Sequence, residues 1–173
     1  MRFLPPSTNS EYSGASISAW FLTFVAFLTL GPGLIHSFLP DGGAQSIADL
    51  DLRDRRDVVI GVFRWEGATQ LAFGLGMLVV SIRYRTLTPL FLALSLLQAA
   101  LIALQGWVLS PPANGHHPPA HFGAIALAAL SALFLALSLR NPRASSAEPS
   151  SSPRPNPGFK PGEEPGPEAR PPS

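Results

Sequence analysis

Two long stretches of this 173-residue chain contain almost no charged side chains, and they constrain its fold more than any other feature. Residues 12–48 hold one acid and no base, and residues 86–139 hold no Lys, Arg, Asp or Glu at all. A soluble domain carries charge at about a quarter of its positions, whereas here the share is 13 %. Stretches of about 20 apolar residues match a hydrocarbon core roughly 30 Å thick. The sequence therefore predicts an all-α integral membrane protein.

Four segments are apolar and long enough to cross a bilayer as helices. They cover about residues 15–39, 57–82, 87–110 and 118–140. A cleavable signal peptide is the competing interpretation of the first segment, but the polar lead before it is long, contains Glu11, and no small-x-small cleavage site follows. Within that segment Gly31-Pro32-Gly33 predicts a kink or an early stop near Pro32, because proline removes a backbone donor.

The links between the segments predict how the spans pair. Only Arg83-Tyr84-Arg85 separates the second span from the third, and short links make antiparallel neighbours, so these two spans are expected to lie side by side. We expect residues 15–140 to form a four-transmembrane-helix bundle of two antiparallel hairpins. Residues 141–173 are rich in proline and serine and cannot bury a core, which predicts a disordered C-terminal tail.

Arginines beside the spans predict the orientation, because basic residues concentrate in cytoplasmic loops. One side has five of them: Arg2, Arg83, Arg85, Arg140 and Arg143. The other side has three, Arg53, Arg55 and Arg56, within a stretch that also contains four aspartates. We therefore expect a multi-pass protein of the cell membrane with both termini, including residues 1–14, in the cytoplasm.

The second span contains polar side chains that are costly inside a bilayer, and each such group suggests a function. Glu66 and Gln70 are four residues apart and so share one helix face, which Phe63, Phe73 and Met77 complete. This stripe is expected to face the bundle rather than lipid. Arg64 lies about 160° from Glu66, toward Asp57, and is expected to anchor the helix at the interface by snorkelling.

The third span carries Gln98 and Gln105, which are seven residues apart and therefore on one face. In an antiparallel pair Gln70 would lie level with Gln98, and Glu66 between the two glutamines. We therefore predict a polar ladder between the second and third spans. Two interpretations stay open: the ladder only holds the bundle together by hydrogen bonds, or it lines a small pocket in which Glu66 accepts a proton or anchors a ligand.

All four histidines are expected on the side of the bundle where this ladder is shallowest: His36, His116, His117 and His121. His117 and His121 have a spacing that can place two imidazoles on one helix face for a metal. Two prolines intervene, however, and loop histidines are more often polar caps, so no metal site is predicted. Hydrogen bonding or proton handling is favoured instead. The predicted ligand-binding residues are Glu66, Gln70, Gln98, Gln105 and His121.

Other function classes are excluded by what the sequence lacks. The net charge of +1 gives no basic patch for nucleic acid. The absence of cysteine excludes disulfides, thiolate metal sites and thiol catalysis. No nucleotide-binding loop or hydrolase motif occurs. Small residues recur on the second span at Gly61, Gly67, Gly74 and Gly76, which predicts close helix packing without any further function.

With these residues in view, the chain resembles the DoxX-like family, small four-helix bacterial membrane proteins of which many are uncharacterised. The resemblance covers about residues 15–140. It rests on a kinked first helix ending in Gly31-Pro32-Gly33, a polar outer link, a helical hairpin turned by Arg83-Tyr84-Arg85, and compact size. Two segments look like family signatures without an assigned chemistry: Arg64-Trp65-Glu66-Gly67-Ala68-Thr69-Gln70 and His116-His117-Pro118-Pro119-Ala120-His121-Phe122-Gly123. Some relatives are associated with respiratory or sulfur redox complexes, and the resemblance therefore implies a quinone or a partner subunit in the membrane. A thiol-based version of that role does not fit a chain without cysteine.

Two functions from different classes follow as expectations. The favoured one is a binding or accessory subunit that holds a small lipophilic molecule, such as a quinone, or a partner between its helices. The alternative is a membrane-embedded enzyme, for instance an isomerase acting on a lipid-like substrate, with Glu66 and a histidine as acid and base. Acid/base catalysis needs two titratable groups on one substrate, and the sequence places only one carboxyl deep in the bundle, so the first is preferred.

Overall fold

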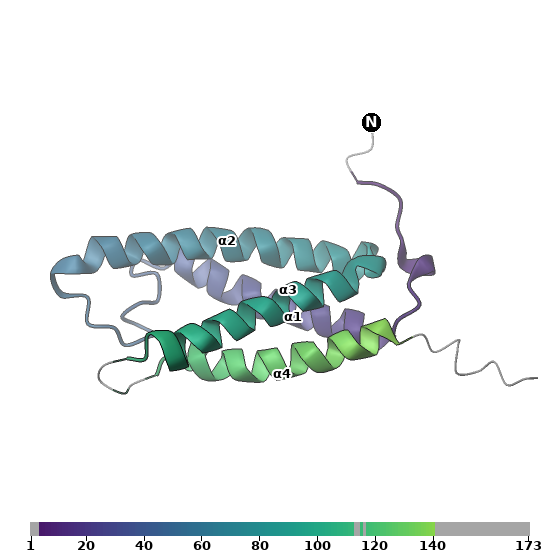
Figure 1. Ribbon diagram of the computed structural model, residues 1–173. Coiled ribbons are helices and arrows are strands. Elements are labelled where there is room, and N and C mark those ends of the chain that lie inside the picture. Colours follow the sequence, from purple (N-terminus) through teal and green to yellow (C-terminus); the bar gives the residue numbers. More distant parts are fainter. Residues whose placement is uncertain (1–3, 113–114, 116, 141–173) are drawn as a thin grey trace, which may run out of the picture.

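The computed structural model describes residues 4–112, 115 and 117–140, and within them the chain forms helices and no strand. Four helices are long and apolar enough to cross a membrane. They are α1 (Ser16–Phe38), α2 (Arg56–Arg83), α3 (Thr88–Leu104) and α4 (Pro119–Leu139) (Figure 1). A π-helical turn, η4 (Gln105–Leu109), extends α3. With that turn, each end lies within one residue of the predicted span. The tail expected at 141–173 and His116 lie outside the described residues.

Helix α1 continues through Pro32 and ends at Phe38, so the predicted alternative of an early stop is wrong. Proline removes only one hydrogen bond of the helix, and packing holds the residues that follow it. Gly33 is buried, and a methyl group placed on it would lie 3.2 Å from the side chains of Gln70 and Leu71. The Leu39 N–H still donates to the Ile35 carbonyl and closes the final turn. Contacts with α2 therefore hold the end of α1 in helical form.

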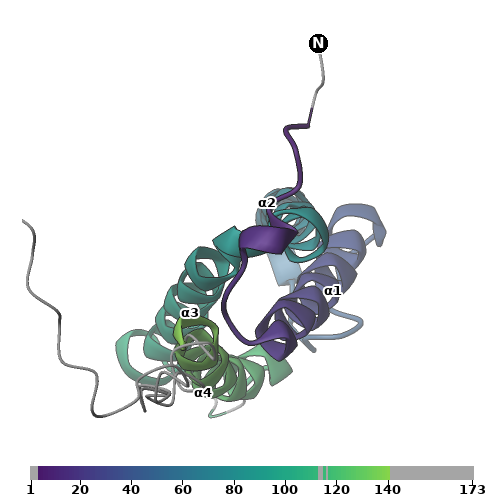
Figure 2. The same ribbon diagram turned by 90° about the vertical axis from the view of Figure 1, so that its right-hand side faces the viewer.

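The four helices follow one another around the bundle in chain order (Figure 2). Helix α1 packs mainly against α2, and α3 packs mainly against α4, whereas α2 and α3 make few contacts with each other. Figure 1 shows α2 and α3 diverging from the link that joins them. The expectation that the second and third spans lie side by side is therefore wrong for most of their length. A short link fixes only where two helices start, and side-chain packing decides whether they stay together.

Small residues explain why α2 packs on α1. A methyl group built on Gly67 would lie 2.7 Å from Ser37 Oγ and 2.8 Å from the Ser37 backbone nitrogen. On Gly74 it would lie 2.8 Å from the Leu30 side chain. Both glycines are buried, which confirms close packing at these positions. Gly61 has no atom within 4 Å of such a group, and its presence is not explained by helix contact.

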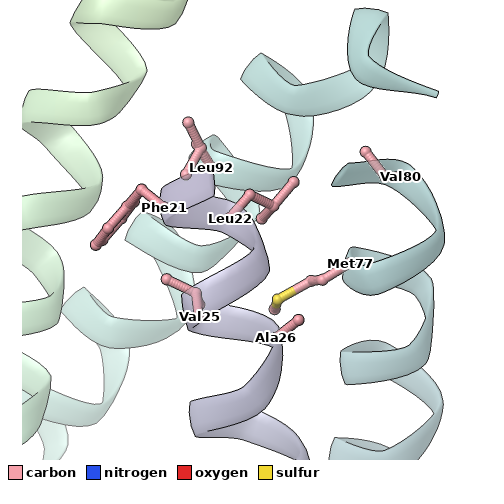
Figure 3. Close-up of a cluster of buried hydrophobic side chains, with 7 residues drawn as sticks. All are labelled: Phe21, Leu22, Val25, Ala26, Met77, Val80 and Leu92. Atoms are coloured by element: carbon pink, nitrogen blue, oxygen red, sulfur yellow. The ribbon is translucent and has the colours of Figure 1, made fainter. Parts of the chain in front are cut away.

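The main hydrophobic core lies in the half of the bundle where α1 begins, and α1 forms its centre (Figure 3). Leu22, Val25 and Ala26 of α1 are fully buried, and Met77 of α2 and Leu92 of α3 close around them. Phe21 points from α1 toward α4, where its ring stacks on Phe134 with centroids 4.1 Å apart. The core thus joins all four helices in this half.

Residues 4–15 cover the end of the bundle that holds this core, which we call the terminal end. The Thr8 N–H and the Ser7 hydroxyl donate to the Arg83 carbonyl, and the Asn9 amide donates to the Ile82 carbonyl. The last carbonyls of a helix have no partner within the helix. The N-terminal segment therefore caps α2. Ala15 extends the same role to α4, because its N–H donates to the Leu137 carbonyl.

We predict that Gly67→Ala destabilises the protein and that Gly61→Ala does not. Alanine favours a helix by up to about 1 kcal/mol over glycine, and at Gly61 nothing opposes this gain. At Gly67 the new methyl group meets the Ser37 backbone, and overpacking of this kind costs about 1–3 kcal/mol. Thermal unfolding in detergent should show Gly67→Ala below wild type and Gly61→Ala at or above it. Equal stability of the two variants would contradict the glycine contact.

Candidate functional site

A cavity of about 520 Å³ lies at the end of the bundle opposite the N-terminal segment, between the two helix pairs. We call it the loop-end cavity, because the loop of residues 39–52 and the start of α4 wall it. Most of its lining is apolar, including Ile35, Phe63 and Ile102. Four polar side chains from four different elements also line it: His36 of α1, Glu66 of α2, Gln105 of η4 and His121 of α4. Apolar walls with a few convergent polar groups are typical of ligand sites.

The loop of residues 39–52 is an ordered wall, and Asp41 organises it. Its carboxylate accepts hydrogen bonds from the backbone N–H groups of Gly43, Gln45 and Ser46, at 3.0, 3.2 and 2.7 Å. The Ser46 and Gly43 N–H groups favour the charged form and lower the pKa of Asp41 to about 2. Gly43 has a φ of +79°, which glycine adopts without strain. This turn brings Gly43 itself, Ile47 and other loop residues to the cavity.

His36 is held in one orientation by the loop. Its Nδ1 lies 2.6 Å from the Gly42 carbonyl oxygen, and its ring meets the Phe63 ring edge-on at 5.0 Å. A carbonyl can only accept, so Nδ1 carries the proton, and in the neutral imidazole Nε2 is an acceptor. The loop thereby fixes both the ring and its tautomer. His36 was placed near the ladder by the sequence but was not among the predicted ligand-binding residues.

His121 is fixed on the opposite wall by aromatic packing. Its Nδ1 lies 3.0 Å from Nδ1 of His117, whose ring stacks on Trp107 with centroids 4.0 Å apart. Trp107 Nε1 donates to the His121 carbonyl. A methyl group on Gly106 would lie 2.6 to 2.7 Å from the His121 ring, so the ring rests directly on the buried glycine backbone. The π-helical turn places both Gly106 and Trp107 here, and such turns occur frequently at functional sites.

A second cavity, of about 330 Å³, lies between α2 and α3, and we call it the side cavity. Glu66, Thr69, Gln70 and Phe73 line it from α2. Leu94, Leu97, Gln98 and Leu101 line it from α3. The Phe73 ring stacks on Phe91 of α3 with centroids 5.8 Å apart. The gap between the diverging helices is thus bounded by an aromatic contact toward the terminal end.

The predicted site residues divide between the two cavities. Gln105 and His121 line the loop-end cavity, Gln70 and Gln98 line the side cavity, and Glu66 lines both. Gln70 Nε2 donates to Glu66 Oε1 at 3.0 Å, along one face of α2. Among the described residues no side-chain hydrogen bond joins α2 to α3. The predicted ladder is therefore wrong as a direct contact between helices. Its members face cavities instead, because α2 is held against α1.

Sequence reasoning left several lining residues out of the predicted set. Ile47 and Leu50 come from the loop, and Ile102 comes from the last turn of α3. The sequence contained only a weak signal for the loop residues: hydrophobic side chains such as Leu50 and Leu52 stand in a link that is otherwise rich in charges of both signs. Ala44, Leu52 and Ile60 form a small buried cluster there, which shows how the loop is attached.

The charged and histidine side chains do not form a metal centre in the part of the chain that the structure describes. No group of three His, Asp or Glu side chains converges there, and His117 and His121 contact each other. Arg64 lines a separate shallow cavity of about 340 Å³ with Arg56 and Asp57, as its helix position predicted. Within residues 4–112, 115 and 117–140, the only ion pair with a nitrogen–oxygen distance below 4 Å joins Arg53 to Asp51. Arg64 is therefore not paired with Asp57.

Comparison of the chain with protein-family models, curated proteins and solved structures gave no match.

We predict that the cavity wall formed by the loop depends on ionised Asp41. Its pKa is about 2 in the folded protein, below the ordinary value of 3.8. The carboxylate therefore stabilises the loop fully above pH 3.8, and this contribution is lost as the pH falls through about 2. At neutral pH, Asp41→Asn should lower hydrogen-exchange protection of the Gly43 and Ser46 amides several-fold.

Asp51→Asn is the matched control, because the Asp51 carboxylate is exposed and accepts from the Arg53 side chain. It should leave these amides as protected as in wild type. Equal loss of protection in both variants would mean that Asp41 does not organise the loop.

Proposed function

We propose that this protein spans the membrane several times and binds a small lipophilic molecule with a polar group in the loop-end cavity. The observation that carries the proposal is the convergence of His36, Glu66, Gln105 and His121 on one largely apolar cavity of about 520 Å³. This volume falls within the range of about 300–1,000 Å³ of small-molecule sites. The four side chains come from separate elements, so contacts between residues close in sequence do not explain why they meet.

The hydrogen-bonding capacity of the cavity indicates the ligand's chemistry. His36 has Nδ1 committed to the Gly42 carbonyl and retains Nε2 as an acceptor when neutral. Gln105 offers both a donor and an acceptor, and Glu66 accepts or, if protonated, donates. A molecule with hydroxyl or carbonyl groups on a lipophilic body fits this set. A quinone, which carries carbonyl groups on a lipophilic body, belongs to this class. The proposed resemblance to DoxX-like proteins implies the same kind of ligand.

The arrangement in the membrane is part of the same proposal. We interpret α1 with α2 and α3 with α4 as two antiparallel hairpins in the cell membrane, with both termini in the cytoplasm. In this orientation the loop-end cavity lies on the outer side. Apolar side chains that remain exposed on α1, such as Trp20, Phe24 and Phe27, are covered by lipid or by a partner subunit.

A membrane-embedded acid/base enzyme is the second candidate, and one observation favours it. Glu66, His36 and His121 line the same cavity, which supplies the two titratable groups that such catalysis needs. An isomerase acting on a lipid-like substrate would use one group to remove a proton and another to return it. Binding remains the preferred function, because it requires only the cavity and its polar lining.

Native mass spectrometry of the protein, purified with its retained lipids, tests the binding function. We predict one bound lipophilic species in wild type and its loss in Glu66→Gln. A buried ligand donor left without its partner costs about 1–3 kcal/mol, which corresponds to about 5- to 150-fold weaker binding. Gly106→Ala should also reduce retention, because the new methyl group displaces the His121 ring.

Arg64→Gln and Gly123→Ala are matched controls. Arg64 lines neither the loop-end cavity nor the side cavity, and a Cβ atom added to Gly123 would meet no neighbouring atom within 4 Å. Both should retain the species. A species retained equally in all variants would place it outside the cavity and would overturn the binding function. The enzyme function would be favoured by a different result. In that case the wild type would hold a chemically converted form of the species, and Glu66→Gln would hold the unconverted form.

Reporter fusions test the proposed orientation. A fusion after Arg85 should report the cytoplasm, and a fusion after Gly115 should report the exterior, because arginines dominate the side that includes Arg83 and Arg85. The opposite pattern of reporter activity would reverse the orientation and place the loop-end cavity on the cytoplasmic side.

A further inference from the structure

The loop-end cavity and the side cavity meet at Glu66, which lines both of them. Along α2, Phe63 faces the loop-end cavity, and Gln70 and Phe73 face the side cavity. These positions recur every three or four residues and thus form one continuous stripe on the helix. Along α3 the order matches: Ile102 lines the loop-end cavity and Leu101 lines the side cavity. The two cavities therefore adjoin at Glu66 of α2 and at the neighbouring residues Leu101 and Ile102 of α3.

The chemistry differs between the two cavities. The loop-end cavity has polar groups from four elements, whereas leucines and a phenylalanine make up much of the side cavity. Leu97 is 55 % exposed and Leu101 46 % exposed, so the side cavity opens at the surface that the bilayer would cover. A cavity with several polar groups thus lies beside a mostly apolar one that opens at the surface.

An unpartnered acceptor lies where the cavities meet. Gln70 donates through Nε2 to Glu66, but its Oε1 is buried and has no hydrogen-bond partner in the described part of the chain. Buried polar atoms without a partner are rare and call for an explanation. A rotation of the Gln70 amide would bring this oxygen to the side cavity, where a ligand hydroxyl would provide the missing partner.

From these observations we infer that the ligand is a single-chain amphiphile, with a hydroxyl-bearing head in the loop-end cavity and its hydrocarbon chain in the side cavity. This inference rests on the proposed binding function and specifies the class of ligand. The chain passes Glu66 and lies against Phe73, Leu94 and Leu97. Seven residues separate Glu66 from Phe73, so about 10 Å of chain lies along the side cavity before the Phe73–Phe91 contact. Beyond that length the chain leaves sideways into lipid, and the ligand enters by the same route.

The test uses a long-chain fatty alcohol with a photoreactive diazirine in mid-chain and the matched alkane without the hydroxyl. Each probe is added to the full-length protein in lipid vesicles, and labelled residues are mapped by mass spectrometry after illumination. We expect the alcohol to label Phe73, the partly buried residue at the inner end of the side cavity. The alkane should label Phe73 at least tenfold less, because it has no group to offer Gln70 or the loop-end cavity, while both probes label the exposed leucines of α3.

Leu97→Trp fills the side cavity, and Leu133→Trp is its matched control. Leu133 is a leucine of α4 with 53 % exposure and lines neither cavity. Leu97→Trp should reduce alcohol labelling of Phe73 at least tenfold, while Leu133→Trp should leave it unchanged. Thr69→Trp fills the cavity from α2 and repeats the experiment should Leu97→Trp fail to fold, as judged by thermal unfolding.

The remaining outcomes separate this inference from the function on which it rests. Alcohol labelling confined to the loop 39–52 and His121, and unchanged by Leu97→Trp, would overturn the chain site but leave the binding function intact. Equal labelling of Phe73 by the alcohol and the alkane would also overturn it. Absence of labelling in both cavities would count against both proposals.

Discussion

The close packing of α2 on α1 is the constraint on which the rest of the structure depends. Gly67 and Gly74 let the α2 backbone approach α1, and the Ser37 backbone lies within 2.8 Å of where a Gly67 methyl group would be. In a membrane, helix association depends on such van der Waals contact, because lipid is as apolar as the helix surface. Once α2 is committed to α1, it cannot also follow α3 along its length. The divergence of α2 from α3 creates the side cavity.

The same commitment orients the polar stripe of α2. Glu66 lies about 100° around the helix from Gly67, so a glycine face turned to α1 directs the carboxyl toward the gap beside α3. Met77 lies on the same stripe near the other end, and there it is fully buried in the core. One stripe therefore serves as core where the bundle is closed and as cavity lining where it is open. The fold separates a stabilising half from a half with room for a ligand.

Both ends of the bundle are closed by chain segments that satisfy backbone groups. At the terminal end, residues 4–15 donate to the last carbonyls of α2 and α4. At the loop end, the Asp41 carboxylate accepts hydrogen bonds from three backbone N–H groups, and His36 Nδ1 donates to the Gly42 carbonyl. A structured loop gives the cavity a rigid wall, which reduces the ordering cost of binding.

Charge distribution and segment length were sufficient to predict the four helices and their ends, because the bilayer sets both. Periodicity correctly placed Glu66 beside Gln70 and put Phe63, Phe73 and Met77 inside the bundle. The partner of α2 could not be predicted, since the short link to α3 and the glycines facing α1 favour different neighbours, and only packing in three dimensions decides between them. Because the short link favoured α3 as the neighbour of α2, Gln98 was expected to contact Gln70 directly. The folding of residues 39–52 onto the bundle depends on long-range contacts such as Ala44 with Ile60, which leave no periodic signal.

The central claim is that α2 is bound to α1 and stands apart from α3 at the level of Gln70. The chain contains no cysteine, so paired substitutions report on it directly in native membranes. Disulfide formation requires Cα atoms within about 7 Å. A Cβ atom on Gly33 of α1 would lie 3.2 Å from the Gln70 Cβ, so the structure predicts rapid oxidation of the pair Gly33→Cys with Gln70→Cys. The pair Gln70→Cys with Gln98→Cys should remain as thiols that react with a lipophilic maleimide. Rapid disulfide formation between positions 70 and 98, with no oxidation of the pair at 33 and 70, would contradict this account.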